Sequence, residues 1–280
     1  PRSTPLYSSA AADVYKRQMP NGRTLQVATY HHYRDQWASA FDLSYEDKNG
    51  NTQMCHQTTF GMSERLLGAV VGMHGDDSGL IMPPSIAPFQ VVVMPVAAHA
   101  DENVIPAVQS LASELSSSGL RVKLDDRDVR PGVKHYDWEI KGVPIRVELG
   151  PRDLKSGKCV VSLRTGGKSE IPLAGAPSSI RSLLDSVSDE LRTRAESVVS
   201  QLVSPLPIED KNSSSPLDAA LSDGVVYEIA FEGNDSDAEL LEKKTGLTLL
   251  GESAMEFDEP RPCVVTGKST TKRQHIARMY

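Results

Sequence analysis

The pattern of apolar and polar residues divides the chain into segments of different period. From residue 23 to residue 60 apolar and polar side chains tend to alternate, as Leu25, Val27 and Thr29 do with their neighbours. A period of two is typical of strands with one covered face, and Asn49-Gly50 is a strong hairpin signal. We therefore predict three antiparallel strands in this stretch.

A nearly continuous apolar helix is predicted over residues 62–74. Its side chains include Leu66, Leu67, Val70, Val71 and Met73, with little polar surface between them. A helix that is apolar on most of its sides needs to be covered by other parts of a protein. We therefore expect this helix to be buried.

From residue 88 to residue 204 the period of the apolar residues switches between that of strands and that of helices. The predicted elements are strands at 89–97, 120–124, 144–149 and 159–163, and helices at 101–117, 135–141 and 178–203. Such alternation is typical of an α/β domain, here with a mixed sheet. A polar linker at 205–223 and a small α/β tail at 224–280 complete the predicted organisation.

Composition places the chain among globular proteins. Of its 280 residues 39 % are hydrophobic and 24 % are charged, with a net charge of −7. That charge argues against a generally basic surface but leaves room for a local basic patch. Cys55, Cys159 and Cys263 are odd in number and far apart, so no disulfide framework is implied and a reducing, cytoplasmic compartment fits. No apolar run approaches the roughly 18 residues of a membrane span.

Residues 1–18 differ in character from everything that follows. They carry neither a starting Met nor the apolar core of a signal peptide. We interpret them as a non-native, adapter-like leader, the alternative being a natural disordered arm, and leave them out of the predicted fold. On this interpretation the chain is a C-terminal fragment of a longer protein.

The most informative stretch lies at residues 57–77. A β-rich run ending at Phe60 meets Gly61, after which the predicted helix begins with Ser63 as a possible cap and Arg65 on its first turn. A strand, a tight turn and a helix with a cation at its start commonly present groups to a phosphate or a flat ring. The alternative is a structural salt bridge of Arg65, for example with Glu64.

Gly61-Met-Ser-Glu-Arg-Leu-Leu-Gly-Ala-Val70, followed by His74-Gly-Asp-Asp77 and Pro83-Pro84, resembles the third signature motif of class II aminoacyl-tRNA synthetases, and within them the prolyl-tRNA synthetase family. The resemblance implies that residues 19–83 are the end of an antiparallel catalytic sheet. It also implies that Arg65 stacks on the adenine of ATP.

A second stretch, Leu25-Gln-Val-Ala-Thr-Tyr-His31, resembles the family's Leu-Gln-x-x-Thr-Ser-His. The resemblance implies ATP contacts from Gln26, Thr29, Ser63 and Arg65, and a proline pocket from His31, Thr59 and Gly61. Thr29 and His31 are two apart on a strand, so both are expected to point into one cleft. A lone histidine is otherwise more often a structural residue. The family continues Leu-Gly-x-x-Phe, whereas this chain has Tyr33-Arg-Asp-Gln-Trp37.

The domain at 88–204 resembles the anticodon-binding domain of the same family, on Asp125-Asp-Arg-Asp128, Pro131-Gly132 and the run Trp138–Leu154. Guanine offers acceptors to arginine or lysine and donors to a carboxylate, so a site that recognises the two guanines of a proline anticodon mixes both charges. The resemblance implies that the anticodon is read by Glu139, Arg146, Arg152, Asp153 and Lys168. The alternative for each is a solvated charged face.

The tail at 224–280 resembles the C-terminal domain of archaeal and eukaryotic-type relatives, many of which hold zinc on four cysteines. Here only Cys263 remains, with Thr266 where its partner would be, so we expect no structural zinc and no other resident metal.

The function implied by the resemblance is ligation of L-proline to tRNA(Pro) through a prolyl-adenylate. Its substrates are ATP with Mg²⁺, proline and tRNA(Pro), no protein side chain acts as a catalytic nucleophile, and the full-length enzyme is a homodimer without a membrane partner. The segment that grips the α-phosphate is missing, so we expect the fragment alone to be inactive. Two alternatives stay open: a threonyl- or glycyl-type enzyme, and a non-catalytic tRNA-binding paralogue.

Overall fold

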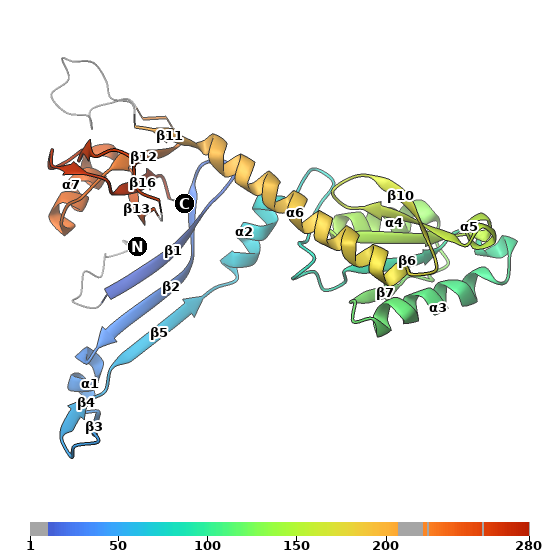
Figure 1. Ribbon diagram of the computed structural model, residues 1–280, viewed down its shortest axis with the longest axis horizontal. Coiled ribbons are helices and arrows are strands. Elements are labelled where there is room, and N and C mark those ends of the chain that lie inside the picture. Colours follow the sequence, from blue (N-terminus) through green and yellow to red (C-terminus); the bar gives the residue numbers. More distant parts are fainter. Residues whose placement is uncertain (1–10, 207–220, 223, 254, 280) are drawn as a thin grey trace. The chain divides into compact units, whose positions relative to one another are not determined.

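The computed structural model describes residues 11–206, 221–222, 224–253 and 255–279. They form two compact units (Figure 1). The first consists of residues up to Ala69 and from Val199 onwards, and the second of Val70–Val198. Each unit is described by itself.

Three sheets and their helices make up most of the two units. In the first unit the strands and helices are β1 (Ala11–Gln18), β2 (Thr24–Arg34), α1 (Gln36–Phe41), β3 (Ser44–Glu46), β4 (Thr52–Met54), β5 (Gln57–Met62), the start of α2 (Arg65–His74), β11 (Val203–Pro205), β12 (Val226–Ala230), α7 (Asp235–Thr245), β13 (Thr248–Glu252), β14 (Arg261–Pro262), β15 (Ser269–Thr270) and β16 (Arg273–Ala277). In the second unit they are β6 (Val91–Pro95), α3 (Val104–Ser117), β7 (Val122–Leu124), α4 (Pro131–Ile140), β8 (Ile145–Leu149), α5 (Pro151–Ser156), β9 (Lys158–Leu163), β10 (Lys168–Pro172) and α6 (Ala176–Leu202).

The first unit contains an antiparallel sheet in the order β1-β2-β5. Antiparallel pairing in the stretch 23–60 is thereby confirmed, but the prediction of three strands there is wrong in detail. The chain between β2 and β5 forms the short helix α1 and a separate ribbon, β3 and β4, around the predicted Asn49-Gly50 turn. The third strand of the sheet is β1, from the segment that we left out of the fold; whether that segment is native stays a prediction.

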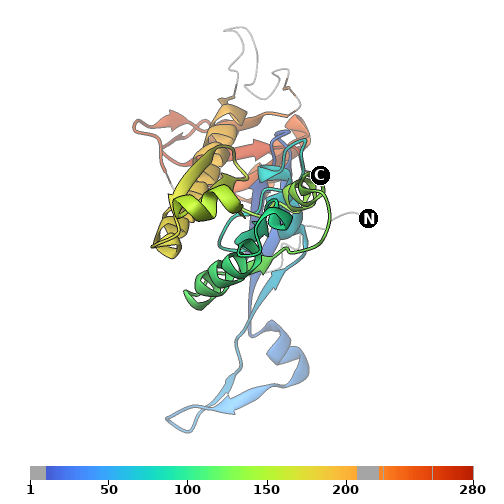
Figure 2. The same cartoon turned by 90° about the vertical axis from the view of Figure 1, so that its right-hand side faces the viewer.

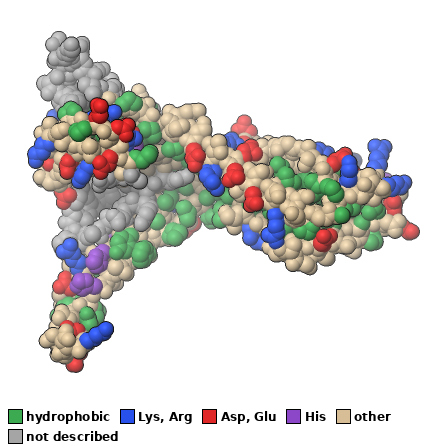
Figure 3. Space-filling model, in the orientation of Figure 1, with side chains coloured by type: hydrophobic (Ala, Val, Ile, Leu, Met, Phe, Trp, Pro, Cys, Tyr) green, Lys and Arg blue, Asp and Glu red, His purple; other side chains and the backbone are tan. Residues whose placement is uncertain are grey.

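Helix α2 begins after a short turn that follows β5, as predicted, but it is not buried. Leu66, Leu67 and Val71 are exposed, while Ala69 and Met73 are buried. In Figure 3 hydrophobic side chains lie at the surface over α2 and the adjoining end of β5. The expectation of burial was wrong because it was based on apolar composition alone. Among the described residues, other parts of the chain pack against only one side of this helix.

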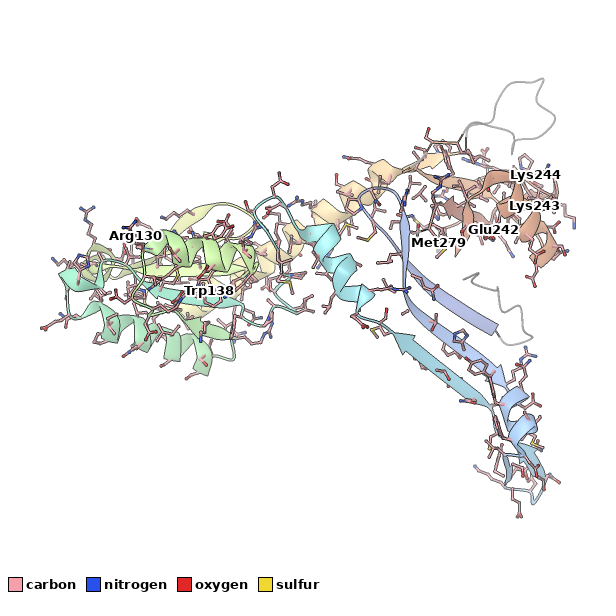
Figure 4. The ribbon with its side chains drawn as sticks, turned by 180° about the vertical axis from the view of Figure 1, so that it is seen from behind. Arg130, Trp138, Glu242, Lys243, Lys244 and Met279 are labelled. Carbon is pink, nitrogen blue, oxygen red and sulfur yellow. The ribbon has the colours of Figure 1, made fainter. Side chains whose placement is uncertain are left out.

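The start of β2 is joined to the end of the chain. The backbone N–H of Thr24 donates to the carbonyl of Arg278 at 2.9 Å, and Thr24 pairs in parallel with Met279, which is labelled in Figure 4. Beyond it lies a second sheet in the order β11-β12-β16-β13. Its core includes Ile229, Leu241 and Ile276. The predicted tail is thus an α/β unit, while residues 207–220 and 223 of the predicted linker lie outside the described residues.

The second unit is built on a five-stranded sheet in the order β10-β9-β8-β6-β7. Strands β7 and β8 are parallel to β6, and β9 and β10 are antiparallel, which confirms the predicted mixed sheet. Its main core lies between one sheet face and helices α3 and α6, seen in the foreground of Figure 2. Helix α4 covers part of the other face, where Trp138 packs with Val92, Met94 and Val143. No helix in the described part of the chain is long and apolar enough to span a membrane.

Candidate nucleotide cleft and nucleic-acid interface

A cleft opens where β5 turns into α2. Thr29 of β2 lies opposite Gly61 of β5, and a Cβ at position 61 would come within 3.0 Å of Thr29 Oγ1. The glycine therefore keeps this end of the two strands free of side-chain bulk. A cleft of about 520 Å³ results, lined by residues 26–29 and 61–65.

The cleft brings together five of the predicted site residues. Gln26, Thr29, Gly61, Ser63 and Arg65 all line it. Gln26 and Thr29 come from one strand, although they are three apart. On a regular strand such residues face opposite sides. Here the pairing of β1 with β2 skips Val27, and this bulge lets Gln26 and Thr29 line the same cleft.

The Arg65 side chain is available to a ligand. It is exposed at the first residue of α2, and within the described ranges no carboxylate lies within ion-pair distance of its guanidinium. The alternative of a salt bridge with Glu64 is therefore not what the structure has. A planar cation on the wall of such a cleft can stack on a flat ring or bind a phosphate.

His31 and Thr59 lie further along the same two strands and do not line this cleft. They form the next pair on the same face, two residues from Thr29 and Gly61, which is about 7 Å along a strand. The expectation of one cleft shared by Thr29 and His31 is therefore met by Thr29 alone. Thr59 lines a neighbouring pocket of about 460 Å³ with Tyr33, Trp37 and Phe41.

Aromatic rings give this neighbouring pocket its character. His31 stacks on Tyr33 with a centroid distance of 5.4 Å, and Trp37 stacks on Phe41 at 6.0 Å. Between them, Arg34 has φ 50, a left-handed conformation that favours glycine. Arg34 therefore occupies a position whose backbone conformation a glycine would adopt without strain.

On the second unit, charged side chains gather on the sheet face that α4 leaves partly open. Arg146, Ser162 and Lys168 are aligned across β8, β9 and β10, so they share this face. Glu139 stands on the last turn of α4 and lines, with Arg146, Ser162 and Arg164, a pocket of about 90 Å³. The pocket carries both charge signs, as predicted for a site that recognises guanine.

His135 lies among these charges. Its Nε2 is 3.1 Å from Glu148 Oε1, and that oxygen accepts a hydrogen bond from Arg146 Nε at 2.9 Å. Burial and the neighbouring Arg146 lower the pKa of His135 below its usual value, although Glu148 opposes them. The Arg146–Glu148 ion pair places charges of both signs beside this histidine.

A buried network holds α4 on the sheet. Asp125, 2 % exposed, accepts from Arg127 Nε at 2.8 Å and from Trp138 Nε1 at 2.6 Å. Arg127 also donates to Asp137 at 2.8 Å. Hydrogen bonds from Arg127 and Trp138 hold the pKa of Asp125 well below its usual range despite burial. Trp138, labelled in Figure 4, directly precedes Glu139, so the network fixes the turn of α4 that carries Glu139.

Arg152 and Asp153 lie on α5, beyond the end of β8, and do not line this pocket. Asp153 Oδ2 accepts from the backbone N–H of Gly150 at 2.8 Å, a contact that stabilises the start of α5. Arg152 is exposed. The sequence analysis did not predict Ser162 and Arg164 as residues of this pocket. Each appears in the sequence only as a polar residue at the end of an apolar strand, a signal too common to indicate a site.

The surroundings of Cys263 do not fit zinc. Its Sγ accepts from the backbone N–H groups of Glu232 at 3.4 Å and Thr266 at 3.5 Å. One thiol with two backbone donors supplies a single ligand where a structural zinc needs four. In the described part of the chain no three side chains of His, Cys, Asp or Glu gather as metal ligands.

Comparison with known proteins relates the chain to a domain family and to proline–tRNA ligases. Residues 90–183 match the family described as "Anticodon binding domain". The chain is 42 % identical over 267 residues to a proline–tRNA ligase of Methanoregula boonei, in a match that covers 94 % of this chain and 54 % of the relative. It is 38 % identical over 280 residues to a proline–tRNA ligase of Thermococcus kodakarensis, and that match covers 98 % of this chain and 57 % of the relative.

Two solved structures are similar over nearly the whole chain. Prolyl-tRNA synthetase of Giardia lamblia, in complex with prolyl-adenylate, has a TM-score of 0.81 and 29 % identity, covering 96 % of this chain and 58 % of that one. Prolyl-tRNA synthetase of Cryptosporidium parvum, complexed with halofuginone and AMPPNP, has a TM-score of 0.82 and 27 % identity. The match covers 96 % of this chain and 57 % of that one. The chain thus spans little more than half the length of the proteins that it matches.

Proposed function

Since the chain is related over nearly its whole length to the prolyl-tRNA synthetases, we propose that it is part of an enzyme that ligates L-proline to tRNA(Pro). The observation that carries this proposal is the cleft that collects Gln26, Thr29, Gly61, Ser63 and Arg65. The reaction runs in two steps. The carboxylate of proline attacks the α-phosphate of ATP, displacing pyrophosphate, and the tRNA 3′ end then takes proline from the adenylate.

The cleft binds the nucleotide in this proposal. Arg65 lies flat on the adenine, while Gln26, Thr29 and Ser63 donate or accept hydrogen bonds to the rest of ATP. Mg²⁺ accompanies ATP as its counter-ion and neutralises phosphate charge. Such a reaction depends on positioning and electrostatics, and no side chain of the chain needs to act as a nucleophile.

Proline binds next to the nucleotide, along the strand pair towards His31 and Thr59. Gly61 lets the small ring approach the backbone, and the aromatic pocket with Thr59 supplies an apolar wall. In this proposal the nucleotide lies at the Thr29–Gly61 pair and proline lies towards the next pair on the same face, His31–Thr59.

The second unit binds the anticodon of tRNA(Pro). Glu139, Arg146 and Lys168 are proposed to contact its two guanines, with Arg152 and Asp153 at the edge of the site. The anticodon-binding family match at residues 90–183 and the mixed charges of the pocket support this assignment. The whole enzyme is proposed to be a cytoplasmic homodimer. The alternatives, a threonyl- or glycyl-type enzyme or a non-catalytic paralogue, find less support, because the relatives named above are proline–tRNA ligases.

A titration of the chain with ATP, followed by backbone amide NMR, tests the cleft. We expect the amides of Gly61, Ser63 and Arg65 to shift, and Arg65→Ala to weaken ATP binding about tenfold, the value of a desolvated cation–π contact of 1–2 kcal/mol. Arg34→Ala, an arginine elsewhere on the same strand pair, is the matched control and leaves ATP affinity unchanged. Equal ATP affinity of Arg65→Ala and the parent chain would contradict the assignment.

Two further measurements separate activity from binding. The chain alone is expected to give no ATP–pyrophosphate exchange with proline, and exchange at the rate of a complete enzyme would contradict its interpretation as a fragment. An anticodon stem–loop with two guanines is expected to bind more tightly than loops in which either guanine is replaced by adenine. Equal affinities would refute anticodon recognition.

A further inference from the structure

An arginine that the sequence did not single out, Arg164, lines the pocket that we assign to the anticodon. The Arg164 side chain is 6 % exposed, and its two terminal nitrogens donate to Asp76, Nη2 to Oδ1 at 2.5 Å and Nη1 to Oδ2 at 2.9 Å. This geometry is a bidentate pair, the strongest form of charge-assisted hydrogen bond in proteins. Arg164 lowers the pKa of Asp76 to about 2. The pair is therefore ionised at any pH near neutrality.

The third contact of Arg164 reaches the helix that carries Glu139. Its Nε donates to the backbone carbonyl of Glu139 at 3.1 Å. Because two bonds to Asp76 fix the plane of the guanidinium, the direction of Nε is fixed as well. Arg164 thus holds the last turn of α4 from one side while its own side chain lines the same pocket.

The chain segment that contains Asp76 holds the end of α4 from the other side. Leu80 N–H donates to Ile140 O, and Met82 N–H donates to Gly142 O, each at 3.0 Å. The two backbones are so close that a Cβ on Gly79 would come within 2.7 Å of Ile140 Cα. Segment 76–82 precedes the matched anticodon-binding region at 90–183, yet it belongs to the same compact unit.

We propose that Asp76 and Arg164 are positioning residues for anticodon recognition, and that segment 76–82 is a working part of the anticodon pocket. Asp76 orients Arg164, and Arg164 together with segment 76–82 sets the position of the Glu139 carboxylate relative to Arg146. Discrimination between guanine and adenine depends on that spacing, since the carboxylate must meet two N–H donors of guanine at once. The proposal rests on the assignment of this pocket to the anticodon.

Binding of anticodon stem–loops to the full chain tests the pair. The measured quantity is the ratio of the dissociation constants for an adenine-substituted loop and for the loop with two guanines. Asp76→Asn removes the charge that orients Arg164, and Arg164→Lys keeps the positive charge but cannot form the fork. Each is expected to lower the ratio about tenfold, mainly by weakening binding of the guanine loop. Asp185→Asn removes the same charge at an exposed position of α6, outside segment 76–82 and outside the lining of the pocket, and is the matched control.

A purely structural role gives a different result. If the pair only stabilises the unit, both variants lower the melting temperature and leave the ratio unchanged, which overturns the proposal. A parent chain that does not distinguish the loops refutes the anticodon assignment itself, so the two failures can be told apart.

Hydrogen exchange of the parent chain provides a second measurement if either variant does not fold. Binding of the guanine loop is expected to slow exchange at the amides of Leu80, Met82 and Gly142 more than binding of the adenine loop does. Equal exchange with both loops at these amides overturns the proposal.

Discussion

Replacing Asp125 by alanine removes the acceptor at the centre of the network that holds α4 on its sheet. The carboxylate is 2 % exposed and receives hydrogen bonds from Arg127 and from the Trp138 indole. In the variant the indole N–H, 2.6 Å from Asp125 Oδ2 in the parent chain, loses its acceptor inside the core. Arg127 keeps Asp137, and its side chain is 46 % exposed, so water can solvate what it loses.

The expected cost follows from these contacts. An unsatisfied buried donor costs about 1–3 kcal/mol, and the loss of a hydrogen bond to a charged group costs about 1.5–3 kcal/mol. Removal of one partner from a fully buried ion pair costs about 3–5 kcal/mol, but the exposure of Arg127 places this network at the lower end of that range. We therefore expect Asp125→Ala to lower the free energy of unfolding of the second unit by about 3 kcal/mol.

Urea unfolding followed by tryptophan fluorescence measures this loss. The chain has two tryptophans, Trp37 and Trp138, so a Trp37→Phe background leaves Trp138 as the reporter of the second unit. The urea midpoint is expected to fall by about 1–3 M, given a typical dependence of about 1–3 kcal/mol per molar urea. Asp126→Ala, at the exposed neighbouring position, is the matched control. A loss below about 1 kcal/mol would refute the reasoning, since it would mean that the network adds little to the packing of Trp138.

The other predictions use different measurements. The pKa of Asp125 is lower in the folded than in the unfolded chain, so the stability that its carboxylate contributes is complete above about pH 4 and is lost as the pH falls below the unfolded pKa. Asp125→Asn should therefore flatten the dependence of the urea midpoint on acid pH. Arg34→Gly should stabilise the first unit by about 0.5–1 kcal/mol in thermal unfolding because φ is 50 there, whereas Arg34→Ala, which keeps the strained conformation, should not. Gly142→Ala should destabilise the second unit by more than about 2 kcal/mol, since φ is 70 and its Cβ would lie 2.6 Å from the Leu80 carbonyl; a smaller loss would show that the two backbones can separate. A chelator should leave the melting temperature unchanged, and a fall on chelation would show a structural metal.

The sequence predicted those elements whose apolar residues keep one period over a long stretch. Strand β6 and helices α3 and α6 lie within a few residues of their predicted positions. Short elements were not predicted: α1 lies within the stretch 23–60, for which only strands were predicted, and α5 has only six residues. A single turn or two of helix has too few side chains to establish a period.

The sequence indicated residues of the candidate cleft that belong to local motifs, and it did not indicate residues that meet only through the fold. Gln26, Thr29 and the stretch from Gly61 to Arg65 were found from local motifs, and β2 and β5 place them together. Arg164 and Asp76 are 88 positions apart, and neither belongs to a local pattern that indicates the other. Such a pair depends on the packing of α4 against both segments, which no single stretch of sequence encodes.

The bond between Thr24 and Arg278 has a consequence for how the first unit folds. Strand β2 carries Gln26, Val27, Ala28 and Thr29 of the proposed nucleotide cleft, and its first residue is tied to a residue far along the chain. Contacts between such distant segments form slowly, because closing a long loop costs conformational entropy before the contact is made. The start of β2 therefore gains this partner late in folding, after the local pairing of β2 with β1.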